Sequence, residues 1–329
     1  MTDPSSVSAK ARTAADVAQR AMDRLVVRDA CPRRYWLVDP MLVEPLEALP
    51  TVADAEIVPI PIRHVDLPSD ARPYLVGARR QDSLDKLLPI YLELAASECL
   101  DAAGPGEPRA RSLCGCIDTP LPADLLARRL AIAAIVLDST RRHRLFRFWD
   151  PRVLQHFVLD DVGLDDWLPG FSGSWSFLDG FGRHRHLRVD DARPGIANHG
   201  RVLTPSDVQR LDEWSDLNAL FEMNACFELE ASNEVWRDLR LCGRAAAELQ
   251  LDDRRARLTL ASMRWQSKLP IEASSRLREI LKTARDSGAP IHAVLTEIDD
   301  ADWTLIQEEA ASANHRAANP ATLLSGFHQ

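Results

Sequence analysis

The chain has 329 residues, 46% of them hydrophobic and 27% charged, so its length and composition predict a folded globular protein of about two domains. Its formal net charge of −9 excludes a general nucleic-acid binder, because such a protein needs a basic surface. No apolar run approaches the ~20 residues that cross a bilayer, and residues 1–20 lack the apolar core of a signal peptide, so we expect a cytoplasmic protein that binds no membrane.

The first part of the chain alternates between strand-like and helix-like segments. We expect a flexible N-terminus over residues 1–19, overlapped by an amphipathic helix that either packs on the first domain or meets a partner. The alternation predicts an α/β domain over residues 20–195, with flanking helices on a mainly parallel or mixed sheet. The expected strands are 34–39, 73–78, 113–117 and 145–149, and the proline-containing segment 57–62 is expected to be an edge strand or an extended loop. The expected helices are 13–27, 41–49, 83–99, 122–137 and 151–162.

The junction between the last of these strands and the helix after it is specified residue by residue. Asp150 stands where a helix N-cap belongs, and Pro151 follows at the first helical position, where its missing N–H is no loss. Strand alternation places Arg147 and Trp149 on one face, opposite the neighbouring phenylalanines. An Arg and a Trp side by side are typical of an interface anchor, although simple packing under a helix explains them as well.

The second part of the chain reads as helical. Residues 170–182 combine glycines with aromatic residues and predict a turn-rich segment, such as a hairpin, that closes the first domain. A linker follows at 190–199, and a helical bundle is expected over residues 196–329. Ser232 or Asn233 is the expected N-cap of one helix, and Gly288 the expected C-cap of another. The expected helices are 205–230, 233–242, 258–265, 273–285 and 302–311.

No catalytic pattern is present. The sequence has no Gly-x-Ser-x-Gly elbow, no His-Glu-x-x-His motif and no phosphate-binding glycine loop. Cys114 and Cys116 stand one residue apart, and strand alternation puts both on one face, where core packing is favoured over metal binding. His184 and His186 have the same spacing, but no third ligand is evident nearby. We therefore expect no catalytic residue, no cofactor and no metal.

Residues 146–154 read Phe-Arg-Phe-Trp-Asp-Pro-Arg-Val-Leu, and this run resembles the signature of the type VI secretion adaptor domain. Other pieces of that family's pattern occur in the expected order: 35–39 (Tyr-Trp-Leu-Val-Asp), 73–76 (Pro-Tyr-Leu-Val) and 167–171 (Trp-Leu-Pro-Gly-Phe), the last followed by Trp175. The last piece departs from the Phe-Gly-Pro that the family often has. The resemblance covers roughly residues 33–178.

Proteins of that family are chaperones that carry a toxic effector to the VgrG spike protein. The resemblance therefore implies a non-catalytic adaptor with two partners, an effector toxin and a VgrG protein, and we assign the helical part to the effector. The residues expected to bind a partner are Arg147, Trp149, Asp150, Arg152, Tyr74 and Trp175. Two alternatives remain open: an immunity protein whose acidic charge suits a basic toxin, and an enzyme with a site that spacing does not reveal.

Overall fold

The computed structural model describes residues 13–25, 33–41, 43–45, 55–78, 81–100, 111–168, 171–189, 201–226 and 229–318. The chain divides into two compact units, and each is described here by itself. The N-terminal unit comprises Met1–Asp212 and Phe227–Ala231, and the C-terminal unit comprises Glu213–Cys226 and Ser232–Gln329. Residues 1–12 of the expected flexible N-terminus and the expected linker at 190–199 lie outside the described residues, whereas residues 14–19 belong to a helix.

The N-terminal unit is α/β and the C-terminal unit helical, which confirms the predicted fold class. Six strands form the main sheet in the order β2-β3-β1-β4-β7-β8. They are β1 (Arg33–Val38), β2 (Ala55–Pro59), β3 (Tyr74–Ala78), β4 (Leu113–Thr119), β7 (Gly173–Leu178) and β8 (His184–Val189). Two further strands, β5 (Ile135–Leu137) and β6 (His143–Leu145), pair separately.

The expectation of a mainly parallel or mixed sheet is wrong, because the strand pairings of the main sheet are antiparallel. Helix α2 (Gln81–Leu100) joins β3 to β4, as expected of a helical crossover between parallel strands. These two strands are parallel to each other but are not neighbours. Strand β1 lies between them and pairs antiparallel with both.

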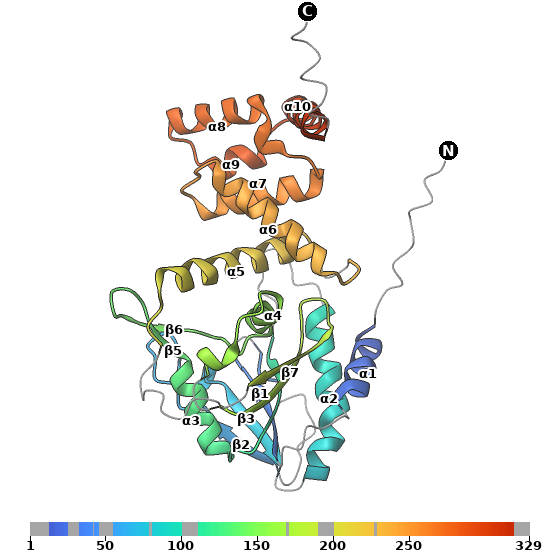
Figure 1. Cartoon of the computed structure of the whole chain (residues 1–329), viewed down its shortest axis with the longest axis vertical. Coiled ribbons are helices and arrows are strands. Elements are labelled where there is room, and N and C mark those ends of the chain that lie inside the picture. Colours follow the sequence, from blue (N-terminus) through green and yellow to red (C-terminus); the bar gives the residue numbers. More distant parts are fainter. Residues whose placement is uncertain are drawn as a thin grey trace, which may run out of the picture. The chain divides into compact units, whose positions relative to one another are not determined.

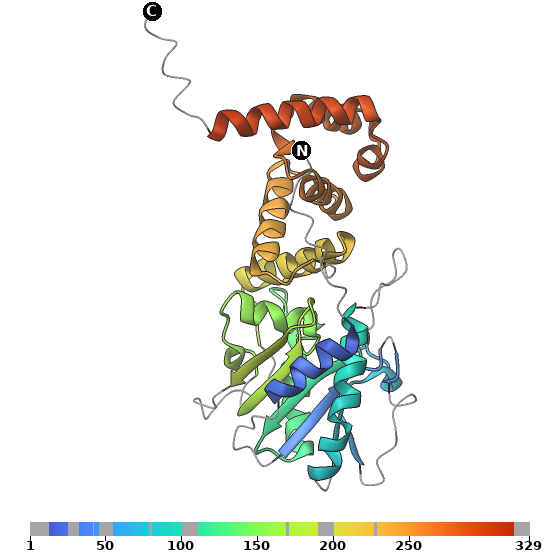
Figure 2. The ribbon, with the colours of Figure 1, turned by 90° about the vertical axis from the view of Figure 1, so that its right-hand side faces the viewer.

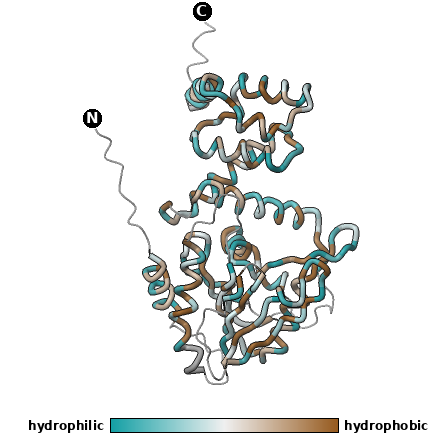
Figure 3. Tube along the Cα trace, turned by 180° about the vertical axis from the view of Figure 1, so that it is seen from behind, coloured by the Kyte–Doolittle hydropathy of each residue, from teal (hydrophilic) through white to brown (hydrophobic). Residues whose placement is uncertain are grey.

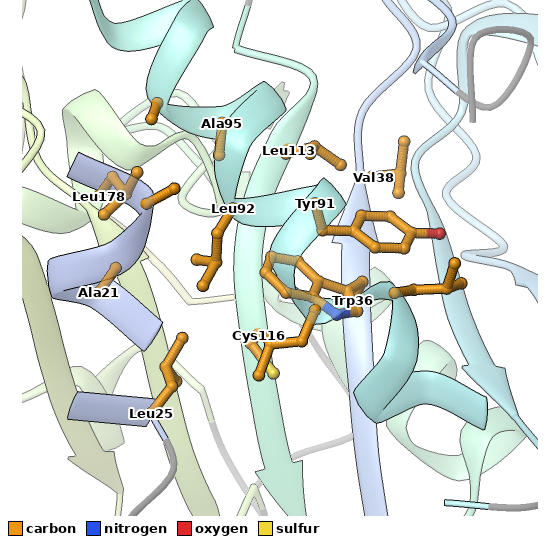
Figure 4. Close-up of a cluster of buried hydrophobic side chains, with 14 of the residues drawn as sticks. Ala21, Leu25, Trp36, Val38, Tyr91, Leu92, Ala95, Leu113, Cys116 and Leu178 are labelled. Atoms are coloured by element: carbon orange, nitrogen blue, oxygen red, sulfur yellow. The ribbon is translucent and has the colours of Figure 1, made fainter. Parts of the chain in front are cut away.

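One face of the sheet carries the helices α1 (Ala14–Leu25) and α2. Figure 1 shows them together on one side of the sheet, with helix α3 (Ala123–Ala133) on the other, and Figure 2 shows α1 crossing α2. Trp36 of β1 stacks on Tyr91 of α2 with ring centroids 4.9 Å apart. The surrounding core cluster, drawn in Figure 4, includes Ala21, Leu25, Val38, Leu92, Ala95, Leu113, Cys116 and Leu178. The amphipathic pattern of the first helix is therefore used for packing.

Two predicted boundaries in the N-terminal unit are corrected. The helix expected over 122–137 ends at Ala133, and the chain then enters β5. The strand expected over 145–149 is also shifted, because β6 ends at Leu145 and residues 148–150 form a turn that leads into α4 (Pro151–Leu159). The aromatic segment does form a hairpin, in which β7 pairs with β8.

The C-terminal unit contains amphipathic helices, visible in Figure 3 as alternating hydrophilic and hydrophobic colours. Ser232 caps α6 and Gly288 ends α8 in the left-handed conformation, as predicted. No helix among the described residues is long and apolar enough to span a bilayer. The helices of the C-terminal unit are α6 (Asn233–Glu248), α7 (Arg254–Ser267), α8 (Ser275–Ser287), α9 (Ile291–Thr296) and α10 (Asp300–Ala318). The second half of α5 (Pro205–Met223) also belongs to this unit. A short 3₁₀ helix, η5 (Ile271–Ala273), also lies in this unit, whereas η2 (Ser69–Ala71) and η3 (Leu164–Asp166) lie in the N-terminal unit.

Candidate functional site

A buried carboxylate, Asp39, lies at the centre of the candidate site. It follows β1 directly, and its backbone N–H donates to the carbonyl of Ser112, which fixes it at the end of the sheet. Trp149 Nε1 donates to Asp39 Oδ2 at 2.6 Å, and Arg147 donates to the same oxygen from Nη2 at 2.6 Å and Nε at 3.2 Å. Arg147 and Trp149 thus reach one acceptor, although neither lies in the strand predicted for them.

A second carboxylate, Asp150, caps helix α4. Its Oδ1 accepts from the backbone N–H of Arg152 at 2.9 Å, and the Arg152 guanidinium binds both carboxylate oxygens, at 3.0 and 2.6 Å. Burial raises the pKa of Asp150, but the charges and hydrogen bonds of Arg152, together with the charge of Arg147, outweigh that effect and leave the pKa lowered. The two carboxylates and two guanidiniums therefore form one compact charge cluster, which we call the arginine cluster: Asp39, Arg147, Asp150 and Arg152.

Cys114 is a buried thiol whose pKa is affected by the charges of this cluster. Its pKa is raised well above the ordinary value, first by burial and then by the negative charges of Asp39 and Asp150. A thiol in that environment stays protonated and unreactive. The regular strand alternation, from which a shared face of Cys114 and Cys116 was predicted, is interrupted here. The register of β4 shifts between Leu37 and Val38 of β1, and this bulge breaks the alternation, so that Cys116 joins the core cluster under α1 and α2 together with Leu113.

The other two aromatic residues predicted to bind a partner are inside the fold. Trp175 is fully buried, and its Nε1 donates to the carbonyl of Cys114 at 3.1 Å. Tyr74 is also buried and donates to Glu44 Oε1 at 2.5 Å, and burial raises its pKa. Of the six residues predicted to contact a partner, Arg147 and Arg152 are the ones with partly exposed side chains, 26% and 20% respectively. Their role in binding stays a prediction.

The sequence pieces that resemble the adaptor family lie next to one another. Trp149 binds Asp39, and Phe148 packs edge-on to Trp175 with centroids 6.0 Å apart. Phe146 packs against Trp167 at 4.9 Å. The 73–76 piece enters β3, which pairs directly with the 35–39 piece in β1. Residues 169 and 170 of the last piece lie outside the described residues.

Two buried charge networks were not anticipated from the sequence. Arg34 of β1 binds Asp118 of β4 through two bonds of 2.6 and 2.8 Å. Asp179 holds the β7–β8 turn, where its Oδ2 accepts from Arg183 at 2.9 Å and from Arg185 at 2.8 Å. For the Arg34–Asp118 pair, the available signal was a charged residue inside an otherwise apolar strand. The basic run at 183–188 is therefore partly neutralised within the fold.

Neither the histidines nor the cysteines assemble a metal centre in the part of the chain that the structure describes. His186 Nδ1 lies 3.2 Å from Ser176 Oγ, and burial lowers the pKa of His184 to about 4. Comparison with known proteins adds no relative: no family model, no curated protein and no solved structure matches the chain.

Proposed function

We propose that the chain is a non-catalytic adaptor that binds a type VI secretion effector and helps to load it onto the VgrG spike. One observation carries the proposal. The Phe-Arg-Phe-Trp-Asp-Pro-Arg run, whose resemblance to the adaptor family motivates it, is built around Asp39, the residue that ends another piece of the same pattern. Arg147 and Trp149 follow Asp39 by 108 and 110 positions in the sequence, and both donate to one oxygen of its carboxylate. The two pieces of the pattern therefore form a single structural unit.

The arginine cluster suits a binding role. Asp39 and Asp150 hold the two guanidiniums in place from the interior of the unit, because their carboxylate side chains are only 1% and 9% exposed. The guanidiniums keep part of their surface in water. Because their rotamers are already fixed, contact with an acidic partner costs less conformational entropy than it would for free arginines. Charge complementarity of this kind favours fast and selective association. We assign this surface to the spike and the helical unit to the effector.

A pull-down of the tagged full chain from a lysate of its own source, followed by mass spectrometry, tests the proposal. We expect a VgrG-like protein and a large toxin to co-elute. Recovery of a toxin alone, with equimolar inhibition of its activity, would point to an immunity protein instead. Recovery of neither partner would overturn the adaptor function.

A variant then tests the surface. Arg152→Gln removes one charge and keeps the Asp150 cap, whose hydrogen bond comes from the backbone N–H. We expect it to weaken capture of the spike protein. The control is Arg128→Gln, because Arg128 is an exposed residue of α3. Equal capture by both variants would remove the arginine cluster from the binding surface while leaving the adaptor function open to other surfaces.

A further inference from the structure

The C-terminal unit contains a pocket of about 230 Å³ that is separate from the arginine cluster. It is formed by α6, α7, the segment after α7 and α10, which are labelled in Figure 1. The volume is below the roughly 300 Å³ at which sites for drug-sized ligands begin. A nucleotide is therefore too large for this pocket, and a ligand of the size of one amino acid suits it.

One side of the pocket is cationic. Lys268 lies directly after α7, and its Nζ is 3.3 Å from the centre of the Trp265 ring, a cation–π contact that holds the ammonium over the indole. Among the described residues, no acidic side chain forms an ion pair with Lys268. Arg264, which also lines the pocket, is already paired with Glu272. The Lys268 ammonium is therefore the positive charge that a ligand carboxylate would meet.

The backbone at Lys268 is unusual for a lysine. Its φ is 58°, in the left-handed region, where helix C-caps normally carry Gly or Asn. Helix α8 of the same unit follows that rule and ends at Gly288. The same left-handed conformation follows two other helices of this unit, at Ala225 (φ 46°) and Gln250 (φ 51°). Lys268 ends α7 in this conformation, and its side chain lies over Trp265.

The remainder of the pocket supplies a negative charge and apolar walls. Asp238 lines it, and its nearest described cation is Arg237, whose Nε is 3.6 Å away in a solvent-exposed pair that contributes little. The apolar lining comes from Leu241, Cys242, Trp265, Leu269 and Pro270. A simple inorganic anion would use neither Asp238 nor these walls.

We infer that this pocket binds a free α-amino acid with an apolar side chain. The Lys268 ammonium pairs with its carboxylate, Asp238 pairs with its ammonium, and the side chain lies against Leu241 and Trp265. Each charge of the zwitterion thereby meets an opposite charge, which offsets its loss of water. This inference does not depend on the adaptor function.

Calorimetric titration of the full chain with L-leucine tests the inference. Two comparison ligands each lack one charge: 4-methylpentanoate has no ammonium, and 3-methylbutylamine has no carboxylate. We expect L-leucine to bind roughly two- to fivefold more tightly than either, because Asp238 and Lys268 are both partly in water and each charge pair is worth up to about 1 kcal/mol. Absence of binding at millimolar L-leucine, or equal binding of all three compounds, would overturn the inference.

Variants assign the two charges. Lys268→Asn removes the ammonium while Asn tolerates the left-handed backbone, and we expect it to weaken L-leucine binding without affecting 3-methylbutylamine. Asp238→Asn should weaken L-leucine binding without affecting 4-methylpentanoate. The control is Lys282→Asn, because Lys282 is an exposed residue of α8. L-leucine binding that survives Lys268→Asn unchanged would exclude the pocket as the site, and thermal unfolding checks that each variant is folded.

Discussion

Truncation of Asp39 to alanine tests the centre of the arginine cluster. The side chain accepts two hydrogen bonds from Arg147 and one from Trp149 at its Oδ2, and its Oδ1 accepts one from the backbone N–H of Met41 at 3.1 Å. Its loss leaves the Trp149 indole N–H, which belongs to a side chain only 1% exposed, without its carboxylate acceptor. An orphaned buried donor costs about 1–3 kcal/mol, and removal of one partner of a buried ion pair costs about 3–5 kcal/mol.

The expected loss of unfolding free energy lies at the lower end of that range. Arg147 is 26% exposed, so water can partly replace Asp39 around its guanidinium. We therefore expect Asp39→Ala to cost about 3 kcal/mol, and Asp39→Asn to cost less because an amide oxygen still accepts one hydrogen bond.

Urea denaturation followed by far-UV circular dichroism and tryptophan fluorescence measures this loss. The matched control is Asp124→Ala, because Asp124 is an exposed residue in the first turn of α3, where a carboxylate contributes only about 0.3–1 kcal/mol. A loss below about 1 kcal/mol for Asp39→Ala, or equal losses for the two variants, would refute the view that Asp39 organises the turn.

Three further predictions concern other parts of the chain. Gly115→Ala should destabilise the protein by about 3 kcal/mol or more in urea denaturation, because φ is +119° and a Cβ would lie 2.5 Å from the carbonyl oxygen of Ser176. Gly243→Ala, in open helical surroundings, should instead stabilise it by roughly 0.5–1 kcal/mol; the opposite order would contradict this account. Hydrogen bonds from Ser274, the Arg276 backbone and Ser275 lower the pKa of Glu309 to about 2 from 4.5. Its contribution to stability is complete above the ordinary pKa and is lost as pH falls towards 2, so Glu309→Gln should flatten the acid loss of stability, whereas Glu308→Gln should not. Ellman's reagent should modify the buried thiols only on unfolding, and rapid modification of native protein at any of them would contradict their burial: Cys99, Cys114, Cys116, Cys226 and Cys242.

The features that the sequence alone determined are local. The Asp150 cap with Pro151 behind it, the Ser232 cap and the Gly288 terminus follow from hydrogen bonds and backbone preferences within a few residues. The division into an α/β part and a helical part follows from hydrophobic periodicity, which is also a local property.

Strand order and the candidate site were decided by the tertiary structure. The residues of β3 and β4 do not indicate that β1 lies between these two strands. Because β1 pairs antiparallel with both, β3 and β4 do not form the parallel pair that the helical crossover suggests. The bulge in β4 interrupts the alternation that the sequence predicts there, so that Leu113 and Cys116 both belong to the core cluster. The sequence predicted one face for Arg147 and Trp149 from a strand that ends before them, and only tertiary packing brings both to Asp39. A buried carboxylate such as that of Asp39 requires hydrogen-bond donors. In this fold the side-chain donors come from residues more than 100 positions away in the sequence, which local patterns cannot reveal.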